Sequence, residues 1–248
     1  MQLKNYIPNA ITMLNLISGL IALIYAFDEN LEMAFFWVCM GIFFDFWDGF
    51  FARLLNVKSD LGLQLDSLAD MVTSGVVPGV VMYKLMSNIE QNREFFNLSS
   101  DNYFLGVIPF IGFLIPVASA YRLAKFNIDD RQTDKFIGLP TPANALLIVS
   151  LPLMLLETGG EGWIFELLNC LLALVVITVL SSYLLISEIH LFSLKMKKIS
   201  WSESKLQIFF LFFALVMLFI FEFSGIPLII ISYIMLSLVL RKIFKFEF

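Results

Sequence analysis

The sequence predicts an all-α integral membrane protein with about eight transmembrane helices. Three observations lead to this fold class: 59% of the 248 residues are hydrophobic, only 15% are charged, and the apolar runs are close to twenty residues long. Soluble domains have about 25% charged residues, so this chain has too few charges to cover a surface that faces water. Apolar runs of about twenty residues match a membrane-spanning helix, whereas a β-barrel would show shorter, alternating segments.

Eight windows of the sequence have the length and apolarity of a span. In chain order they are residues 9–27, 32–51, 66–84, 104–123, 141–157, 164–187, 206–222 and 226–243. The connections 28–31 and 223–225 are very short, which predicts a helical hairpin at each of them. The first three spans carry Asn, Asp and Gly that lipid alone would not tolerate, so these faces are expected to point inward. Three polar segments are expected to be loops, namely 87–103, 124–140 and 188–205.

The basic residues predict the orientation of the spans. If the N-terminus is cytoplasmic, fourteen of the sixteen Lys and Arg residues fall on the cytoplasmic side, and only Lys84 and Arg93 fall outside. Cytoplasmic loops of membrane proteins carry such an excess of basic residues. We therefore expect a multi-pass protein of the cell inner membrane, with both termini in the cytoplasm.

Cysteine and histidine offer no metal site of their own. Cys39 and Cys170 each lie within an apolar run, and His190 is the only histidine of the sequence. Neither a disulfide framework nor a zinc site is predicted from these residues. The basic residues follow the predicted membrane topology, and we expect no nucleic acid partner.

Four aspartates form two closely spaced pairs at the predicted cytoplasmic ends of neighbouring spans. Asp45 and Asp48 are three residues apart, and Asp66 and Asp70 are four apart. Residues at these spacings share one face of a helix, and the short loop between the spans brings both pairs to one depth. Four anions at low dielectric repel one another strongly. We therefore expect one or two divalent cations among them, because carboxylate oxygens suit Mg²⁺, Mn²⁺ or Ca²⁺.

The residues beside the aspartates indicate a nucleotide. Gly49 and Ala52 keep one helix face free of bulk, and the planar guanidinium of Arg53 can bind phosphate oxygens. Gly62 relaxes the connecting loop, and Ser59 offers a hydroxyl to phosphate. A metal cluster next to an arginine is suited to attack on a phosphoryl group.

These residues form a pattern of eight fixed positions. In order, they read Asp45-x2-Asp48-Gly49-x2-Ala52-Arg53-x8-Gly62-x3-Asp66-x3-Asp70. This pattern resembles, position for position, the signature of the CDP-alcohol phosphatidyltransferase family. The resemblance implies a catalytic domain of six spans within residues 1–190, with its active site at the cytoplasmic membrane face. Residues 191–248 would then be a cytoplasmic linker and two additional spans.

The resemblance also implies roles for individual residues. The four aspartates would bind two divalent cations, Mg²⁺ or Mn²⁺, and Asp70 would be the general base that deprotonates the acceptor alcohol. The CDP-diacylglycerol substrate would be held by residues of the signature and of the first span: Pro8, Asn9, Ala10, Ile11, Gly49, Ala52, Arg53, Ser59 and Gly62. A homodimer in the lipid bilayer is expected from the resemblance alone.

Three further segments are similar to the branch of the family that uses serine as the acceptor. They are PNAITMLNLISG (8–19), RLAKFNID (122–129) and FIGLPTPANA (136–145), so that the resemblance covers about residues 8–150. It implies transfer of the phosphatidyl group to the hydroxyl of L-serine with release of CMP. The carboxylate of serine would be received near the metal site by one or more basic residues, namely Arg122, Lys125, Arg131 or Lys135.

Two other interpretations stay open from the sequence. The same chemistry with another alcohol, glycerol 3-phosphate or inositol phosphate, would use the same signature. In a different class, carboxylates within a membrane also mark cation transporters. The clustering of the four aspartates at one face, with no acidic residue at mid-depth in the remaining spans, argues against a path across the bilayer.

Overall fold

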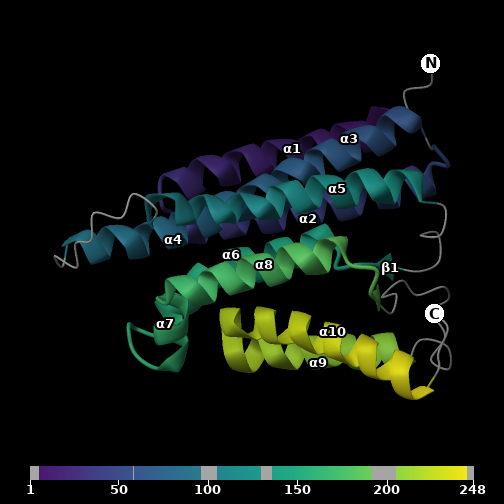
Figure 1. The fold of residues 1–248 in the computed structure, drawn as a ribbon. Coiled ribbons are helices and arrows are strands. Elements are labelled where there is room, and N and C mark those ends of the chain that lie inside the picture. The colour runs from purple at the N-terminus through teal and green to yellow at the C-terminus, as the bar shows by residue number, and fades with distance from the viewer. Residues whose placement is uncertain (1–5, 58, 96–104, 130–135, 192–204, 245–248) are drawn as a thin grey trace.

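Long apolar helices dominate the structure, which confirms the all-α membrane class (Figure 1). The structure is a computed structural model that describes residues 6–57, 59–95, 105–129, 136–191 and 205–244. The first four predicted spans correspond to α1 (Tyr6–Phe27), α2 (Leu31–Leu54), α3 (Asp60–Asp70) with its continuation α4 (Val77–Phe95), and α5 (Leu114–Ile128). The last four correspond to α6 (Thr141–Glu157), α7 (Trp163–Leu168) with α8 (Leu171–Ile186), α9 (Lys205–Phe221) and α10 (Gly225–Phe244).

Five stretches of the described helices are long and apolar enough to cross a membrane. These are Tyr6–Phe27, Leu31–Leu54, Asp60–Ile89, Gly106–Ile128 and Leu206–Leu240. The last stretch contains both α9 and α10, which fold back on each other at the short 3₁₀ turn η5 (Glu222–Ser224). Helices α6 and α8 are apolar but shorter. Together, these helices account for all eight predicted spans.

The third span is longer than the apolar window predicts. It begins at Asp60 because Ser59 caps the helix, with the Ser59 Oγ accepting a hydrogen bond of 3.0 Å from the backbone N–H of Gly62. It continues to Phe95, so the first part of the predicted loop 87–103 is helical. Six residues just after Asp70, Met71–Val76 (η2), form a π-helix. An apolar window detects the part of a helix that lies in lipid, and it therefore misses polar turns at either end.

Two other spans differ from the prediction within their length. The fourth begins as a 3₁₀ helix, η3 (Leu105–Phe113), and α5 extends it to Ile128, into the predicted loop 124–140. The sixth predicted span, 164–187, is wrong as a single helix, because the chain is extended at Cys170 between α7 and α8. The amide of Asn169 donates to the carbonyl of Phe165 at 3.0 Å and terminates α7.

A two-residue antiparallel ladder was not predicted. Strand β1 (Phe136–Ile137) pairs with β2 (His190–Leu191), with Ile137 opposite His190. Directly after β1, the backbone N–H of Gly138 donates to the carbonyl of Ile189 at 2.8 Å. Gly138 has a φ of 76°, and a β-carbon there would lie 2.8 Å from the carbonyl oxygen of Leu185. The ladder therefore fastens the entry to α6 against the end of α8.

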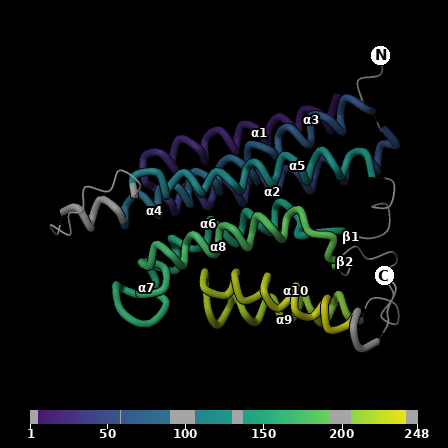
Figure 2. Tube along the Cα trace, viewed as in Figure 1, coloured from purple at the N-terminus to yellow at the C-terminus, as the bar shows by residue number. Residues whose placement is uncertain are grey.

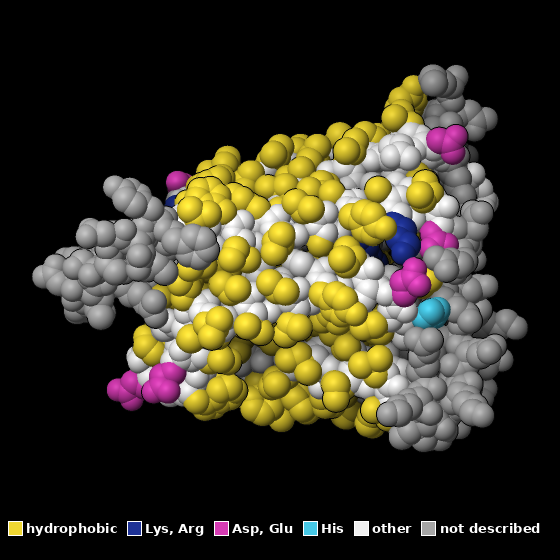
Figure 3. Space-filling view, viewed as in Figure 1, with side chains coloured by type: hydrophobic (Ala, Val, Ile, Leu, Met, Phe, Trp, Pro, Cys, Tyr) yellow, Lys and Arg dark blue, Asp and Glu magenta, His cyan; other side chains and the backbone are white. Residues whose placement is uncertain are grey.

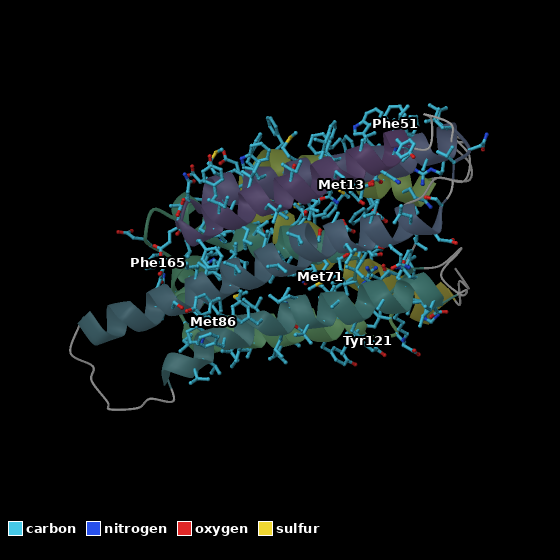
Figure 4. All side chains as sticks on the ribbon, turned by 90° about the horizontal axis from the view of Figure 1, so that it is seen from above. Met13, Phe51, Met71, Met86, Tyr121 and Phe165 are labelled. Carbon is cyan, nitrogen blue, oxygen red and sulfur yellow. The ribbon has the colours of Figure 1, made fainter. Side chains whose placement is uncertain are left out.

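The helices form three layers that follow the chain (Figures 1 and 2). Helices α1 to α5 make the first layer, α6 and α8 lie beneath them, and the pair α9 and α10 packs against α6 from the far side. Seen from above, α3 and its continuation α4 lie between α1 and α5, and Met71 lies midway along the bundle (Figure 4). The strands, the start of α1 and the end of α2 share one end of the bundle, which we call the strand end.

The core and the surface fit a membrane environment. One apolar cluster fills the space between the first two layers, and a second joins α6 and α8 to the C-terminal pair through Leu139, Leu191, Phe210, Ile230 and Tyr233. The face shown in Figure 3 is covered by apolar side chains along its middle, with charged side chains gathered toward its two ends. Phe219, for example, is 90% exposed. An apolar surface of this kind is stable in lipid and not in water.

Candidate active site

Three of the four predicted aspartates meet at the strand end. One carboxylate oxygen each from Asp45 and Asp48 of α2 and from Asp66 of α3 lie within 4.8 Å of one another. Asp48 is buried, and Asp66 Oδ1 is buried with no hydrogen-bond partner among the described residues. Hard divalent cations take oxygen ligands at about 2.0–2.6 Å. The three carboxylates can therefore hold a divalent cation, which would give the orphaned oxygen its partner.

Asp70 lies one helical turn beyond Asp66, on the same side of α3. It is 9% exposed, and its carboxylate is close enough to Asp66 and to Arg122 for their charges to interact. Its Oδ1 accepts a hydrogen bond of 3.1 Å from the side-chain amide of Asn15. The structure thus places Asp70 next to the other three aspartates and in contact with the first span.

Two residues of α1 that the sequence interpretation did not assign contact the aspartates. Thr12 Oγ1 is 2.6 Å from Asp48 Oδ2 and 3.1 Å from the carbonyl oxygen of Pro8, and it can donate to either. Asn15 is fully buried and reaches Asp70. A signal was present in the sequence, because Asn9, Thr12 and Asn15 recur every three residues in an apolar span. Polar residues at that spacing share a face.

Small residues let α1 and α2 approach the π-helical segment closely. A β-carbon at Gly19 or Gly41 would collide with the side chain of Thr73. Thr73 is fully buried, and its Oγ1 donates to the backbone carbonyl of Asn15 at 3.1 Å. This close packing holds Asn15 against the helix that carries Asp70. Gly-mediated contacts of this kind are common between helices in membranes.

The residues predicted to hold the nucleotide lie around the same carboxylates. At the start of α1, Pro8 is buried, whereas the three residues that follow it, Asn9, Ala10 and Ile11, are exposed or half-buried. A β-carbon at Gly62 would be 3.0 Å from both Asn9 Oδ1 and Ser59 Oγ, so the first turns of α1 and α3 are adjacent.

The other nucleotide candidates lie on the last turns of α2. A β-carbon at Gly49 would be 3.8 Å from the guanidinium of Arg53, so the missing side chain leaves room beside that group. Arg53 itself is exposed, and Ala52 is half-buried. The strand end therefore presents an accessible guanidinium on the same helix as Asp45 and Asp48, five residues after Asp48.

The four basic residues predicted to bind the carboxylate of serine differ in their surroundings. Arg122 is 8% exposed, its Nη1 donates to Thr141 Oγ1 at 3.4 Å, and its Nε is buried without a partner among the described residues. Lys125 forms an ion pair of 3.0 Å with Glu188, and it is therefore already neutralised. Arg131 and Lys135 lie outside the described residues. Only Arg122 is shown next to the acidic cluster, through its electrostatic interaction with Asp70.

A side-chain hydrogen bond between α3 and α5 completes the arrangement. The amide of Asn127 donates to Ser67 Oγ at 2.9 Å, and Ser67 directly follows Asp66 in the chain. Asn127 Oδ1 is buried and has no partner among the described residues. Asn127 belongs to the segment RLAKFNID, but the sequence interpretation assigned roles only to the basic residues of that segment.

The fold and the site define a membrane-embedded enzyme that acts on phosphate esters, because clustered carboxylates beside arginines are suited to phosphoryl transfer. The chain belongs to the CDP-alcohol phosphatidyltransferase family, whose model matches residues 5–175. This finding confirms the resemblance seen in the signature. The matched region runs from α1 into α8 and leaves α9 and α10 outside it.

Several curated proteins are similar to this chain over most of that region. A CDP-diacylglycerol–serine O-phosphatidyltransferase of Bacillus subtilis is 37% identical over 151 residues, which are 59% of this chain and 75% of the relative. A protein of the same name from Methanocaldococcus jannaschii is 34% identical over 183 residues, 74% of this chain and 72% of the relative. One from Mycobacterium leprae is 30% identical over 164 residues, 63% of this chain and half of the relative.

Proposed function

We propose that this protein is a CDP-diacylglycerol–serine O-phosphatidyltransferase, which transfers the phosphatidyl group of CDP-diacylglycerol to the hydroxyl of L-serine and releases CMP. Family membership supports the phosphatidyl transfer, and the names of the similar proteins support the serine acceptor. The observation that carries the proposal is the cluster of three carboxylates at the strand end, with the charge of the buried Arg122 interacting with that of Asp70. This arrangement would provide both a base and a cation for an acceptor that bears a carboxylate.

Asp45, Asp48, Asp66 and Asp70 would hold two divalent cations, Mg²⁺ or Mn²⁺. The orphaned Asp66 Oδ1 and the proximity of three carboxylates support this assignment. Such cations, when bound, would supply positive charge to the diphosphate and to the leaving phosphate. The hard oxygen ligands of the cluster favour these ions over zinc or copper.

The nucleotide half of CDP-diacylglycerol would bind at the strand end, between the first turn of α1 and the last turns of α2. Arg53 is exposed beside the space left by Gly49, and its guanidinium can pair with phosphate oxygens in a bidentate manner. Asn9, Ser59 and Gly62 lie together where α1 and α3 are adjacent, and they would contact the nucleotide from that side. The remaining candidates, Pro8, Ala10, Ile11 and Ala52, would complete the contact surface.

Asp70 would act as the general base. Its carboxylate would accept the proton of the serine hydroxyl as the serine oxygen forms a bond to the β-phosphorus, which bears diacylglycerol. The bond from that phosphorus to the bridging oxygen then breaks, and CMP leaves with the bonding electron pair. A positioned general base contributes about 10²–10⁴-fold to the rate.

Arg122 would bind the carboxylate of serine. Its Nε is buried and lacks a partner among the described residues, so a substrate carboxylate can satisfy a donor that the protein leaves unpaired. Thr141, which accepts from Arg122 Nη1, fixes the guanidinium from the side of α6. Lys125 is already paired with Glu188. Arg131 and Lys135, which lie outside the described residues, would be the further candidates for the serine carboxylate.

The proposed setting is the cell inner membrane, with the strand end and both termini facing the cytoplasm. The excess of basic residues on that side supports this orientation. Serine is a soluble substrate, and it would reach Asp70 from the aqueous side. A homodimer and the division of the chain at residue 190 into a catalytic domain and an additional helical pair are further proposals.

The release of CMP from CDP-diacylglycerol by the purified protein tests this function. Assays with L-serine, glycerol 3-phosphate and inositol phosphate as alternative acceptors would give product with serine alone. Product with glycerol 3-phosphate but none with serine would replace the acceptor and keep the chemistry. No CMP with any alcohol would contradict the enzyme assignment and favour a cation transporter.

A further inference from the structure

The first span provides the polar side chains that contact the acidic cluster from outside α2 and α3. Thr12 and Asn15 lie on one face of α1, and their side chains reach Asp48 and Asp70 at 2.6 and 3.1 Å. Both residues are buried, with exposed fractions of 3% and 0%. A buried polar side chain in an apolar helix is costly unless it is paired, and these contacts pair the Thr12 hydroxyl and the amide nitrogen of Asn15.

Asn15 is packed against two other elements, the π-helical segment and α2. Its backbone carbonyl accepts from Thr73 Oγ1 at 3.1 Å, and Thr73 lies three residues after Asp70 in the π-helical segment. A β-carbon at Gly41 of α2 would be 2.9 Å from Asn15 Oδ1, so the missing side chain leaves just enough room for the amide. These contacts hold the backbone of Asn15 and restrict the space around its side chain, and the hydrogen bond to Asp70 orients the amide, whose Oδ1 has no partner among the described residues.

The direction of this hydrogen bond determines which oxygen of Asp70 stays available. The Asn15 amide occupies Asp70 Oδ1, and Asp70 Oδ2 is then the oxygen left to accept a proton from the acceptor alcohol or to bind a cation. Without Asn15, the carboxylate could rotate about its terminal torsion, which is broad for Asp. Correct alignment of reacting groups makes a large contribution to enzymatic rates.

We propose that Asn15 is a positioning residue for the reaction, and that it fixes the rotamer of the Asp70 carboxylate so that one defined oxygen faces the acceptor hydroxyl. Thr12 plays the corresponding role for Asp48. This inference rests on the proposed function in one respect, because it takes Asp70 as the base. Neither residue touches a substrate in this proposal, and both act through the carboxylates.

The test compares Asn15→Ala and the nearly isosteric Asn15→Leu with the wild type. Both variants lack the donor, and Asn15→Leu keeps the volume in case the alanine variant fails to fold. We expect kcat to fall about ten- to a hundredfold, the range that a hydrogen bond to a charged group supplies. The KM values for serine and CDP-diacylglycerol should change less than threefold, because no substrate contact is lost.

Ser18→Ala is the matched control. Ser18 lies on the same face of α1, is 1% exposed, and donates only to the carbonyl of Leu14 at 2.8 Å. If loss of a buried polar side chain from α1 were enough to impair the enzyme, Ser18→Ala would show the same kcat loss. That result, or a kcat for the folded Asn15 variants within threefold of the wild type, would overturn the inference.

A second measurement needs no turnover. Titration of the purified, substrate-free protein with Mn²⁺, followed by electron paramagnetic resonance, reports how well the carboxylates are arranged. Thr12→Val and Asn15→Leu should each weaken Mn²⁺ binding at least fivefold, whereas Ser18→Ala should bind as the wild type does. Unchanged binding in both variants would contradict a positioning role. If the wild type bound Mn²⁺ but released no CMP, the proposed function would fail. The Mn²⁺ titration of the variants would still test whether Thr12 and Asn15 position the carboxylates.

Discussion

Arg122 of α5 and Asp70 of α3 are both buried in the interior of the bundle, and their opposite charges interact. A buried charge is stable only when a partner is close. This interaction, together with the hydrogen bond from Arg122 Nη1 to Thr141, offsets part of the cost of burying an arginine that is 8% exposed. It also links the residue proposed to bind the acceptor to the residue proposed as the base.

The first prediction concerns this arginine. Arg122→Ala is expected to raise the KM for serine at least tenfold, because a charge-assisted hydrogen bond contributes about 1.5–3 kcal/mol. The KM for CDP-diacylglycerol should change much less. Initial rates of CMP release, with each substrate varied in turn, measure both values. Lys84→Ala is a suitable control, because Lys84 pairs with Glu29 far from the site. Equal losses for both substrates would assign Arg122 to the nucleotide or to the fold.

The second prediction concerns the base. Asp70→Asn should reduce phosphatidyl transfer to less than about 1% of the wild-type rate, in line with the loss of a general base. The protein should still fold, since Asn keeps the shape of the side chain. Asp60→Asn is the matched control, because Asp60 is exposed on the first turn of the same helix. Substantial activity of Asp70→Asn would move the role of base to another residue.

The third prediction concerns the metal. Protein treated with a chelator and then freed of it should be inactive, and either Mg²⁺ or Mn²⁺ should restore CMP release. Asp66→Asn should weaken Mn²⁺ binding, because one of the three converging carboxylates is lost. Calorimetric or spectroscopic titration of the substrate-free protein measures this directly. Full activity in the presence of excess chelator would exclude a divalent cation from the reaction.

The fourth prediction concerns orientation. Single cysteines at Asp60 and at Glu161, in a background without Cys39 and Cys170, should react with membrane-impermeant reagents from opposite sides. Both native residues are exposed: Asp60 begins α3, and Glu161 lies between α6 and α7 at the opposite end of the bundle. In intact cells only the cysteine at position 161 should be labelled. Labelling at position 60 from outside would place the acidic cluster on the other face of the membrane.

The fifth prediction concerns the turn that leads into α6. Gly138→Ala should lower the melting temperature, because a left-handed backbone with a side chain costs about 1–3 kcal/mol and the β-carbon would meet the carbonyl of Leu185. Gly106→Ala is the control, since a β-carbon there meets nothing within 4 Å. Thermal unfolding in detergent compares the two. An unchanged melting temperature for Gly138→Ala would mean that the turn relaxes freely.

The sequence was sufficient to predict the class of fold and the position of the acidic cluster. Apolar length predicts spans because lipid demands about twenty apolar residues, and α6 begins and ends where the window does. Helical spacing placed Asp45 and Asp48 on one face, as the structure confirms. These inferences depend on local periodicity, which can be read directly from one amino-acid sequence.

Other features could not be read from local periodicity. The interruption at Cys170 occurs within a window that is apolar on average, where Asn169 alone signals a break, and the β1–β2 ladder pairs residues more than fifty positions apart. The contacts of Thr12 and Asn15 depend on how closely α1 approaches α2 and α3. That distance is determined by which small residues face each other, and pairing of faces between helices is a tertiary property.

The π-helical segment after Asp70 has a consequence for how this helix tolerates length changes. A π-helical turn accommodates one residue more than an α-helical turn does. If one residue between Met71 and Val76 were deleted, the segment could revert to regular α-helix, and the positions beyond it would keep nearly the same angle relative to Asp70, because the tighter α-helical turn holds one residue fewer. The buried Val81, Met82 and Leu85 would then still face the core, whereas a deletion within a regular α-helix rotates every later residue by about 100°. The π-helical segment is therefore a place where this helix can lose one residue and still present its acidic face to the site and its apolar face to the core.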